Sequence, residues 1–212
     1  MAGKEMETRT RSKAAASKAG SAAPAPSATN SYLFVYNAVS GAFWTGVFLR
    51  WAILLPLVGP EYMADGLGSF ACWVQTGALL EVVHAAVGLV RSPLATTAIQ
   101  VASRILLVWG VVYLFPLAGK SPAYTSMILA WSVTEIVRYA YYAFNLRGSV
   151  PRTLTWLRYN TFYVLYPIGV ASEMLVMIAA LPFADRWSVL YGWLLRAILV
   201  VYIPGFYVIA GG

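Results

Sequence analysis

Cysteine, histidine and charged side chains are all scarce in this sequence. The single cysteine, Cys72, rules out an internal disulfide, and no arginine-bearing phosphate loop follows it, which argues against a cysteine phosphatase. The single histidine, His84, has no partners with which to form a metal site. Charged residues make up only 11% of the chain, against about 25% in soluble domains. These shortages argue against a soluble, disulfide-bonded or metal-cluster protein.

Apolar residues take the place of the missing charge. Hydrophobic side chains account for 60% of the sequence and the mean hydropathy is +0.68, which indicates an integral membrane protein. Residues 1–30, in contrast, are rich in Ala, Ser, Lys and Pro and lack the apolar core of a secretory signal. They hold too little apolar surface to offset the entropy lost on ordering, so we expect a disordered cytosolic tail.

Six apolar segments follow the tail, and each is long enough for a membrane-spanning helix of ~20 residues. Stretches such as "VGPEYMADGLG" and "PFADR", with glycine, proline or charge, separate them and predict the turns. We therefore expect an all-α integral membrane protein, a six-transmembrane-helix bundle over residues 31–212 with a disordered N-terminal tail. The predicted spans are roughly 32–55, 68–90, 94–117, 123–146, 159–182 and 187–210.

The formal net charge of +7 is unevenly distributed along the chain. Five of the fifteen Lys and Arg residues lie in the tail. Four more, on the same predicted side, are Arg91, Arg147, Arg152 and Arg158. Only Lys120 and Arg186 fall on the other side, and this asymmetry of nine to two predicts cytosolic termini. Because no basic patch is interleaved with aromatic residues, nucleic acid is not expected, and anionic headgroups or an anionic substrate are better partners.

Several polar residues lie well inside the apolar segments, where they are costly and usually mark a function. At 1.5 Å rise per residue, most of them lie about 10 to 15 Å from the cytosolic end of their span, in one layer. A polar cavity open to the cytosol requires such a layer. For Glu135 and Arg138, three residues apart, a purely structural ion pair is an equal alternative. The residues are Glu81, His84, Arg104, Glu135, Arg138, Tyr166 and the deeper Glu173.

The fourth segment carries a polar and aromatic stripe at helical spacing, the opposite of what lipid exposure favours. Its members are Trp131, Glu135, Arg138, Tyr142 and Asn145. Tyr141 and Tyr142 could instead be aromatic residues of the membrane interface. His84 is expected to be a hydrogen-bonded buried histidine more often than a group that touches substrate.

The stretch "LYPIGVASE" (165–173) places Tyr166 and Glu173 seven residues apart, on one side of the fifth segment, with Gly169 between them. Pro167 cannot donate a backbone hydrogen bond and predicts a kink. A kinked packing helix explains the proline and the glycine, but it leaves a glutamate buried without purpose. A tyrosine hydroxyl and a carboxyl around a small gap suit acid–base chemistry on a carbon chain.

Five stretches follow one another between residues 88 and 206: "GLVRSPL", "QVASRILLVWG", "AWSVTEIVRYAYYAF", "LRYNTFYVLYPIGVASE" and "YIPGF". With them the sequence resembles the very-long-chain (3R)-3-hydroxyacyl-CoA dehydratases of the endoplasmic reticulum, also called protein tyrosine phosphatase-like proteins. The resemblance implies six spans and the third step of fatty-acid elongation, in which a 3-hydroxyacyl-CoA loses water to give the trans-2-enoyl-CoA.

The resemblance implies that Tyr166 and Glu173 are the catalytic pair. We expect Glu173 to act as base and Tyr166 as acid or carbonyl donor, although the reverse assignment stays open. No metal is expected, and no cofactor either, because CoA is part of the substrate. Arginines could hold the thioester oxygen or the CoA phosphates. The candidate substrate-binding residues are Arg104, Arg138, Glu135, Arg158, Arg91 and Gly169.

The resemblance also implies a location in the endoplasmic reticulum membrane and association with the elongase and the two reductases of the cycle. Members of this family usually continue past the last span into a basic tail, whereas this chain ends at Gly212. Either the chain is truncated or its retention depends on another feature. The competing hypothesis is a non-catalytic membrane scaffold or small transporter that uses the intramembrane polar layer. A transporter should carry polar residues toward both faces, and here they favour one.

Overall fold

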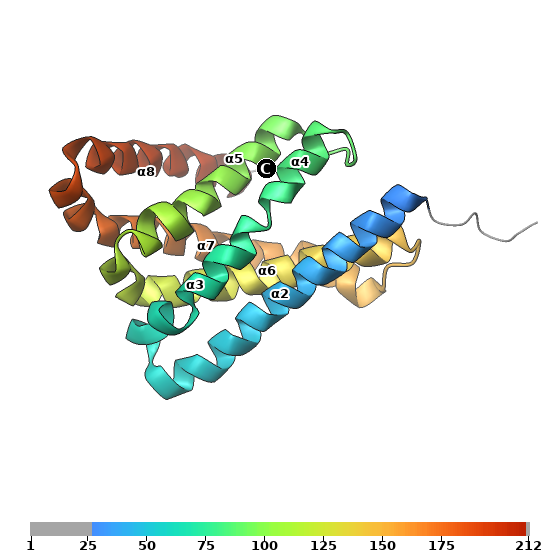
Figure 1. Cartoon of the computed structure of the whole chain (residues 1–212), viewed down its shortest axis with the longest axis horizontal. Coiled ribbons are helices and arrows are strands. Elements are labelled where there is room, and N and C mark those ends of the chain that lie inside the picture. The colour runs from blue at the N-terminus through green and yellow to red at the C-terminus, as the bar shows by residue number, and fades with distance from the viewer. Residues whose placement is uncertain (1–26, 211–212) are drawn as a thin grey trace, which may run out of the picture. The chain divides into compact units, whose positions relative to one another are not determined.

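The computed structural model describes residues 27–210, with side chains as far as Tyr202, and every regular element in that part of the chain is a helix (Figure 1). The tail predicted to be disordered lies outside the described residues, apart from its last few. Of these, Ala28–Asn30 already belong to the first helix. The sequence therefore placed the start of the first helix a few residues too late.

Helices cover all six predicted segments. Two segments are interrupted: the second divides into α3 and α4 at Gly77, and the third passes from α5 into η2, a run of wider π-helical turns. The elements are α2 (Ala28–Val58), η1 (Pro60–Tyr62), α3 (Met63–Thr76), α4 (Leu79–Ala86), α5 (Leu94–Ile105), η2 (Leu106–Tyr113), η3 (Pro116–Lys120), α6 (Pro122–Leu146), α7 (Arg152–Trp187) and α8 (Val189–Ala210).

The predicted break at "VGPEYMADGLG" is too long, because α3 already begins at Met63 and contains two of its glycines. A Cβ at Gly66 would lie 2.8 Å from Cδ1 of Leu54 on α2. This glycine therefore permits a close approach of two helices and does not end one. The sequence alone does not tell whether a glycine ends a helix or allows a neighbouring helix to approach.

The predicted break at "PFADR" is also misplaced. Helix α7 runs through Pro167 and Pro182 without interruption and ends only at Trp187, where Ser188 adopts an extended conformation. A proline removes one backbone donor, and a helix packed along most of its length tolerates that loss. Helix α7 is such a helix, since it packs along α6 on one side and α8 on another.

The length and apolar composition of its helices identify the chain as an all-α membrane protein. Among the described residues, four helical stretches are long and apolar enough to cross a bilayer, and the described part of α8, Val189–Tyr202, is a shorter apolar helix. Helix α6 is not among the four. It carries a polar stripe of which Trp131 and Glu135 are buried against neighbouring helices, whereas Tyr142 and Asn145, nearer its end, are exposed. That six segments span the membrane stays a prediction.

The core of the unit that begins at Tyr32 lies around α6. Figure 1 shows α6 (yellow) and α7 (orange) running alongside one another, and α8 packs against α7. Helix α2 joins α6 where the Trp51 indole donates to the Thr125 carbonyl at 3.0 Å, and where Gly41 approaches the Tyr139 side chain. The interior face of α6 therefore meets residues from α2, α5 and α7, and the polar residues of these helices gather there.

Candidate active site

Glu173 is a buried carboxylate with a hydrogen bond to each oxygen. Its side chain comes from the middle of α7 and the residue is 8% exposed. The indole Nε1 of Trp131, on α6, donates to Oε1 at 2.8 Å. The hydroxyl of Tyr202, on α8, donates to Oε2 at 2.9 Å. Three helices thus converge on one carboxylate.

Tyr166 lies on the same helix and is half-buried. Its ring stacks on Phe162 one turn earlier, with centroids 4.9 Å apart and planes inclined by 27°. Seven residues separate it from Glu173, which corresponds to about 10 Å along the helix axis. Their seven-residue spacing places the two functional groups on the same side of α7.

Gly169 lies between them and is buried against α6. A Cβ at this position would be 3.7 Å from Cβ of Ala130, an ordinary van der Waals contact. Of the two uses expected for this glycine, room for a ligand and close packing of a helix, the structure displays the helix contact. Its role in binding substrate stays a prediction.

Four of the residues predicted to share a polar layer form one connected ion-pair network, which does not include His84 or Tyr166. Arg138 bonds both oxygens of Glu81 at 2.8 Å and Oε2 of Glu135 at 2.6 and 2.8 Å. Arg104 of α5 pairs with the other oxygen of Glu135. The Tyr139 hydroxyl donates to Glu81. The two cations and two carboxylates neutralise each other, and they connect α4, α5 and α6.

This network touches the Glu173 site through Trp131. The Arg104 guanidinium lies over the Trp131 ring, 4.8 Å from its centroid, and the same indole holds Glu173. A cation over a tryptophan face is attracted by the ring quadrupole. The shared layer inferred from depth is therefore a set of contacts. In the structure Arg104, Arg138 and Glu135 pair within the network. That they bind substrate stays a prediction.

His84 has the role expected of a buried histidine. It is 3% exposed, and its Nε2 shares a hydrogen bond of 2.9 Å with the hydroxyl of Tyr32. Tyr36 packs edge-on against the same ring with centroids 4.7 Å apart. The histidine thereby fastens the start of α2 to α4.

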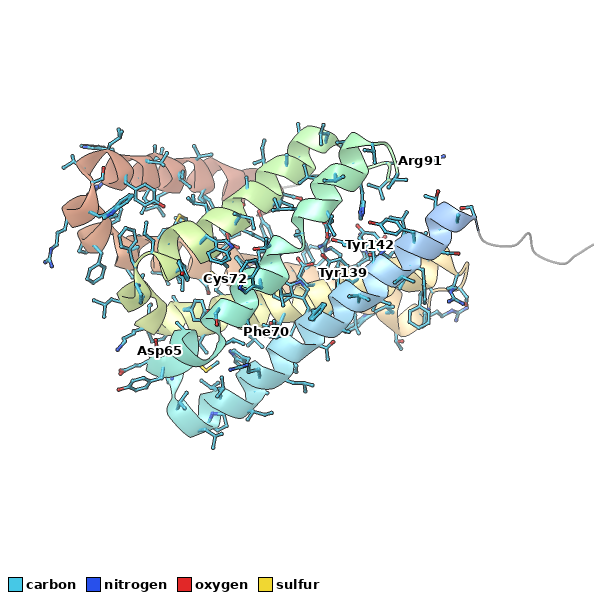
Figure 2. All side chains as sticks on the ribbon, viewed as in Figure 1. Asp65, Phe70, Cys72, Arg91, Tyr139 and Tyr142 are labelled. Carbon is cyan, nitrogen blue, oxygen red and sulfur yellow. The ribbon has the colours of Figure 1, made fainter. Side chains whose placement is uncertain are left out.

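Arg158 and Arg91, two of the arginines expected near CoA phosphates, occupy different settings. Arg158, near the start of α7, lies over the rings of Tyr141 and Tyr142 and donates to the Tyr142 hydroxyl at 3.2 Å. Its Nη1 is buried without a hydrogen-bond partner. Arg91 is exposed in the connection between α4 and α5, as Figure 2 shows. The network does not include either side chain.

Comparison with known proteins decides the family. The model of the protein tyrosine phosphatase-like proteins, PTPLA, matches residues 75–211, which include every member of the network and the Tyr166–Glu173 pair. The chain belongs to this family.

The PTPLA relatives of this chain carry dehydratase names. A probable very-long-chain (3R)-3-hydroxyacyl-CoA dehydratase of Schizosaccharomyces pombe is 46% identical over 84% of this chain and 86% of its own. The dehydratase hpo-8 of Caenorhabditis elegans is 38% identical over 82% and 87% of the two chains. PASTICCINO 2 of Arabidopsis thaliana is 36% identical over 82% and 85%. No solved structure matches this chain.

The phosphatase part of the PTPLA name finds no support at the cysteine. Cys72 is buried, and its thiol donates to the backbone carbonyl of Val108 at 3.4 Å. Phosphatase chemistry needs an accessible thiolate beside a phosphate-binding loop. Cys72 is therefore a core residue between α3 and η2.

Two side chains of the site escaped prediction from the sequence. Trp131 stands out as a member of the α6 stripe, but the stripe does not reveal that its indole reaches Glu173. Tyr202 lies in the "YIPGF" stretch, where nothing in the local pattern indicates a partner on α7. Both contacts join helices remote in sequence and depend on how each helix is rotated about its axis.

Proposed function

We propose that this chain catalyses the dehydration of (3R)-3-hydroxyacyl-CoA to trans-2-enoyl-CoA, the third step of the very-long-chain fatty-acid elongation cycle. The relatives described above are named for this reaction and match more than four-fifths of the chain. The structural observation that carries the proposal is a buried, hydrogen-bonded Glu173 carboxylate on the same helix face as the Tyr166 hydroxyl. Such a pair offers one proton acceptor and one proton donor on one side of a helix.

The reaction balances with these two groups alone. Glu173 takes the proton from C2, next to the thioester carbonyl. The electron pair of that C–H bond becomes the C2=C3 double bond. The C3–O bond breaks, the oxygen leaves with the proton of Tyr166, and water is released. Return of the proton from Glu173 to Tyr166, directly or through water, restores the enzyme. No electrons are exchanged with a cofactor, and CoA enters and leaves as part of the substrate.

The charged groups of α7 suit an amphiphilic thioester. Arg158, Phe162 and Tyr166 follow each other at four-residue spacing, so they share a face of the helix, and Glu173 lies two turns further along it. The proposed arrangement places the CoA phosphates near Arg158, whose Nη1 is without a partner, and the acyl chain beyond Glu173. The carbons that react then lie between Tyr166 and Glu173.

The proposal includes a place in the cell and partners. The protein would reside in the endoplasmic reticulum membrane with both termini in the cytosol, where acyl-CoA substrates are available. It would act with the elongase that supplies the 3-ketoacyl-CoA chain and with the two reductases that precede and follow the dehydration. The packing of Arg147 over Phe34, with 3.9 Å between guanidinium carbon and ring centroid, supports this orientation. It places the basic connection after α6 at the same end of the unit as the start of α2.

The test is a direct assay. The full chain, purified in detergent, is incubated with a very-long-chain (3R)-3-hydroxyacyl-CoA, and the enoyl-CoA is measured by mass spectrometry. The (3S) epimer serves as the matched substrate control. We expect conversion of the (3R) compound only. A folded, monodisperse protein that converts neither epimer would refute the proposal and favour a scaffold or small transporter.

A further inference from the structure

Each oxygen of the Glu173 carboxylate is held by a donor from another helix. Trp131, 2% exposed on α6, binds Oε1, and Tyr202 on α8 binds Oε2. An indole N–H can only donate a hydrogen bond, so the oxygen it meets must offer a lone pair. With both oxygens accepting, the arrangement suits the ionised carboxylate and restricts rotation of its terminal torsion.

The Trp131 donor is itself held in place. Its ring lies beneath the Arg104 guanidinium of α5, and Arg104 is anchored by its ion pair with Glu135 one turn further along α6. Trp131 thus connects the ion-pair network on one side with the proposed base on the other. A rigid donor keeps the direction of its hydrogen bond, and this is the property that a preorganised catalytic group requires.

We propose that Trp131 and Tyr202 are positioning residues, which hold the Glu173 carboxylate directed toward C2 of the substrate. This inference rests on the proposed dehydratase function. Of the two assignments left open by the sequence, it favours Glu173 as the base, because a carboxylate whose two oxygens both accept hydrogen bonds has no proton of its own to donate. Tyr166 is then the acid.

The charged and ionisable groups around Glu173 come from three helices. On its own helix the nearby ionisable group is the Tyr166 hydroxyl. From α8 it faces Tyr202, and from α5 the positive charge of Arg104 lies beyond the Trp131 ring. Trp131 itself does not titrate. Removing the indole N–H therefore changes one hydrogen bond and leaves every charge in place.

The experiment compares Trp131→Phe and Tyr202→Phe with matched controls in the purified full chain. Trp109→Phe removes an indole that donates to the Thr76 hydroxyl at 2.9 Å. Tyr191→Phe removes a hydroxyl on α8 that donates to the Gly110 carbonyl at 2.8 Å. The controls lose the same kind of group from partly buried positions, without contact to Glu173.

We expect kcat to fall about 10- to 100-fold in Trp131→Phe and in Tyr202→Phe, because each leaves one oxygen of the base unheld and its direction toward C2 less well defined. KM should change less than about twofold, since neither side chain is proposed to bind CoA. The thermal unfolding midpoint should change no more than it does in the controls. Both controls should keep the wild-type kcat and KM.

The outcomes separate this inference from the function on which it rests. If wild-type protein converts no substrate, the proposed function has failed. If wild-type protein is active and both variants keep its kcat, the positioning role is refuted. A fall in kcat of equal size in variants and controls would also refute it, since packing alone would then explain the loss. Should Trp131→Phe unfold, Tyr202→Phe decides the question, because it removes only an oxygen.

Discussion

The guanidinium of Arg138 on α6 faces the carboxylate of Glu81 on α4 through two parallel hydrogen bonds of 2.8 Å. The same cation also serves Glu135 three residues earlier on its own helix. One arginine therefore neutralises parts of two carboxylates, and Arg104 supplies the second positive charge. The two positive and two negative charges of these four groups therefore balance inside the bundle.

Arg104→Ala and Arg138→Ala should both lose far more activity than Arg147→Ala, which removes an exposed arginine. Either interior change leaves Glu135, 3% exposed, short of a partner. Breaking a buried ion pair from one side typically costs about 3–5 kcal/mol. Turnover and the thermal unfolding midpoint in detergent, at matched expression, measure the effect. Wild-type turnover in all three variants would show that the network is dispensable.

Tyr166→Phe and Glu173→Gln should each reduce turnover by roughly 10²–10⁴-fold, the usual contribution of a positioned acid or base. Both keep size and shape, so insertion and packing should survive. The double variant should lose less than the product of the single losses, because the two groups act in one step. Conversion of 3-hydroxyacyl-CoA at matched protein amounts is the measurement.

Tyr163→Phe is the control for the tyrosine. It makes the same chemical change on the same helix, at a residue that is 77% exposed. Its activity should equal that of the wild type. Unchanged rates in both Tyr166→Phe and Glu173→Gln would leave the stretch between them as a packing helix only.

The proposed orientation predicts where sugars can be attached. A glycosylation acceptor inserted between α2 and α3, at Gly59–Tyr62, should be modified in microsomes, and one inserted between α6 and α7, at 147–151, should not. The reason is the excess of arginine at the second connection. Gel mobility before and after glycosidase treatment reports the result, and modification of the second site alone would reverse the topology.

Gly169→Leu should lower the thermal unfolding midpoint, whereas Gly169→Ala should not. A Cβ at this position fits at 3.7 Å from Ala130, but the branched end of leucine would enter α6. Overpacking of this kind typically costs about 1–3 kcal/mol. Equal midpoints for the two variants would show that the helices are less closely packed here than described.

The sequence predicted which residues lie inside the bundle better than it predicted where helices end. Charges in an apolar segment must be covered, so Glu81, Arg104 and Arg138 could be placed in one layer from depth alone. The network confirms that they meet. Helix ends were harder, because Gly66 and Pro182 look like breaks but lie within helices. Whether a glycine ends a helix or admits a neighbour depends on packing with residues far away in sequence.

The pairings across helices were beyond reach of the sequence for a related reason. The contacts of Glu173 with Trp131 and Tyr202 span 42 and 29 residues. A rotation of one helix by a single residue position, about 100°, would point either donor elsewhere. Spacing along one helix reveals which residues share a face, as it does for Tyr166 and Glu173. It does not reveal which residues of a neighbouring helix pack against that face.

The closed network has a consequence for the order in which the protein is made. Glu81 leaves the ribosome 57 residues ahead of Arg138, so α4 and α5 enter the bilayer before either of their final partners on α6 exists. An unpaired ion at the centre of a helix costs ~2.5–3.5 kcal/mol during insertion. Because α4 and α5 are neighbours with opposite charges, we expect Glu81 and Arg104 to pair first with each other. When α6 arrives, Glu81 would exchange Arg104 for Arg138, and Arg104 would pair with Glu135. The insertion of α6 is then the step that fixes the final arrangement of the bundle.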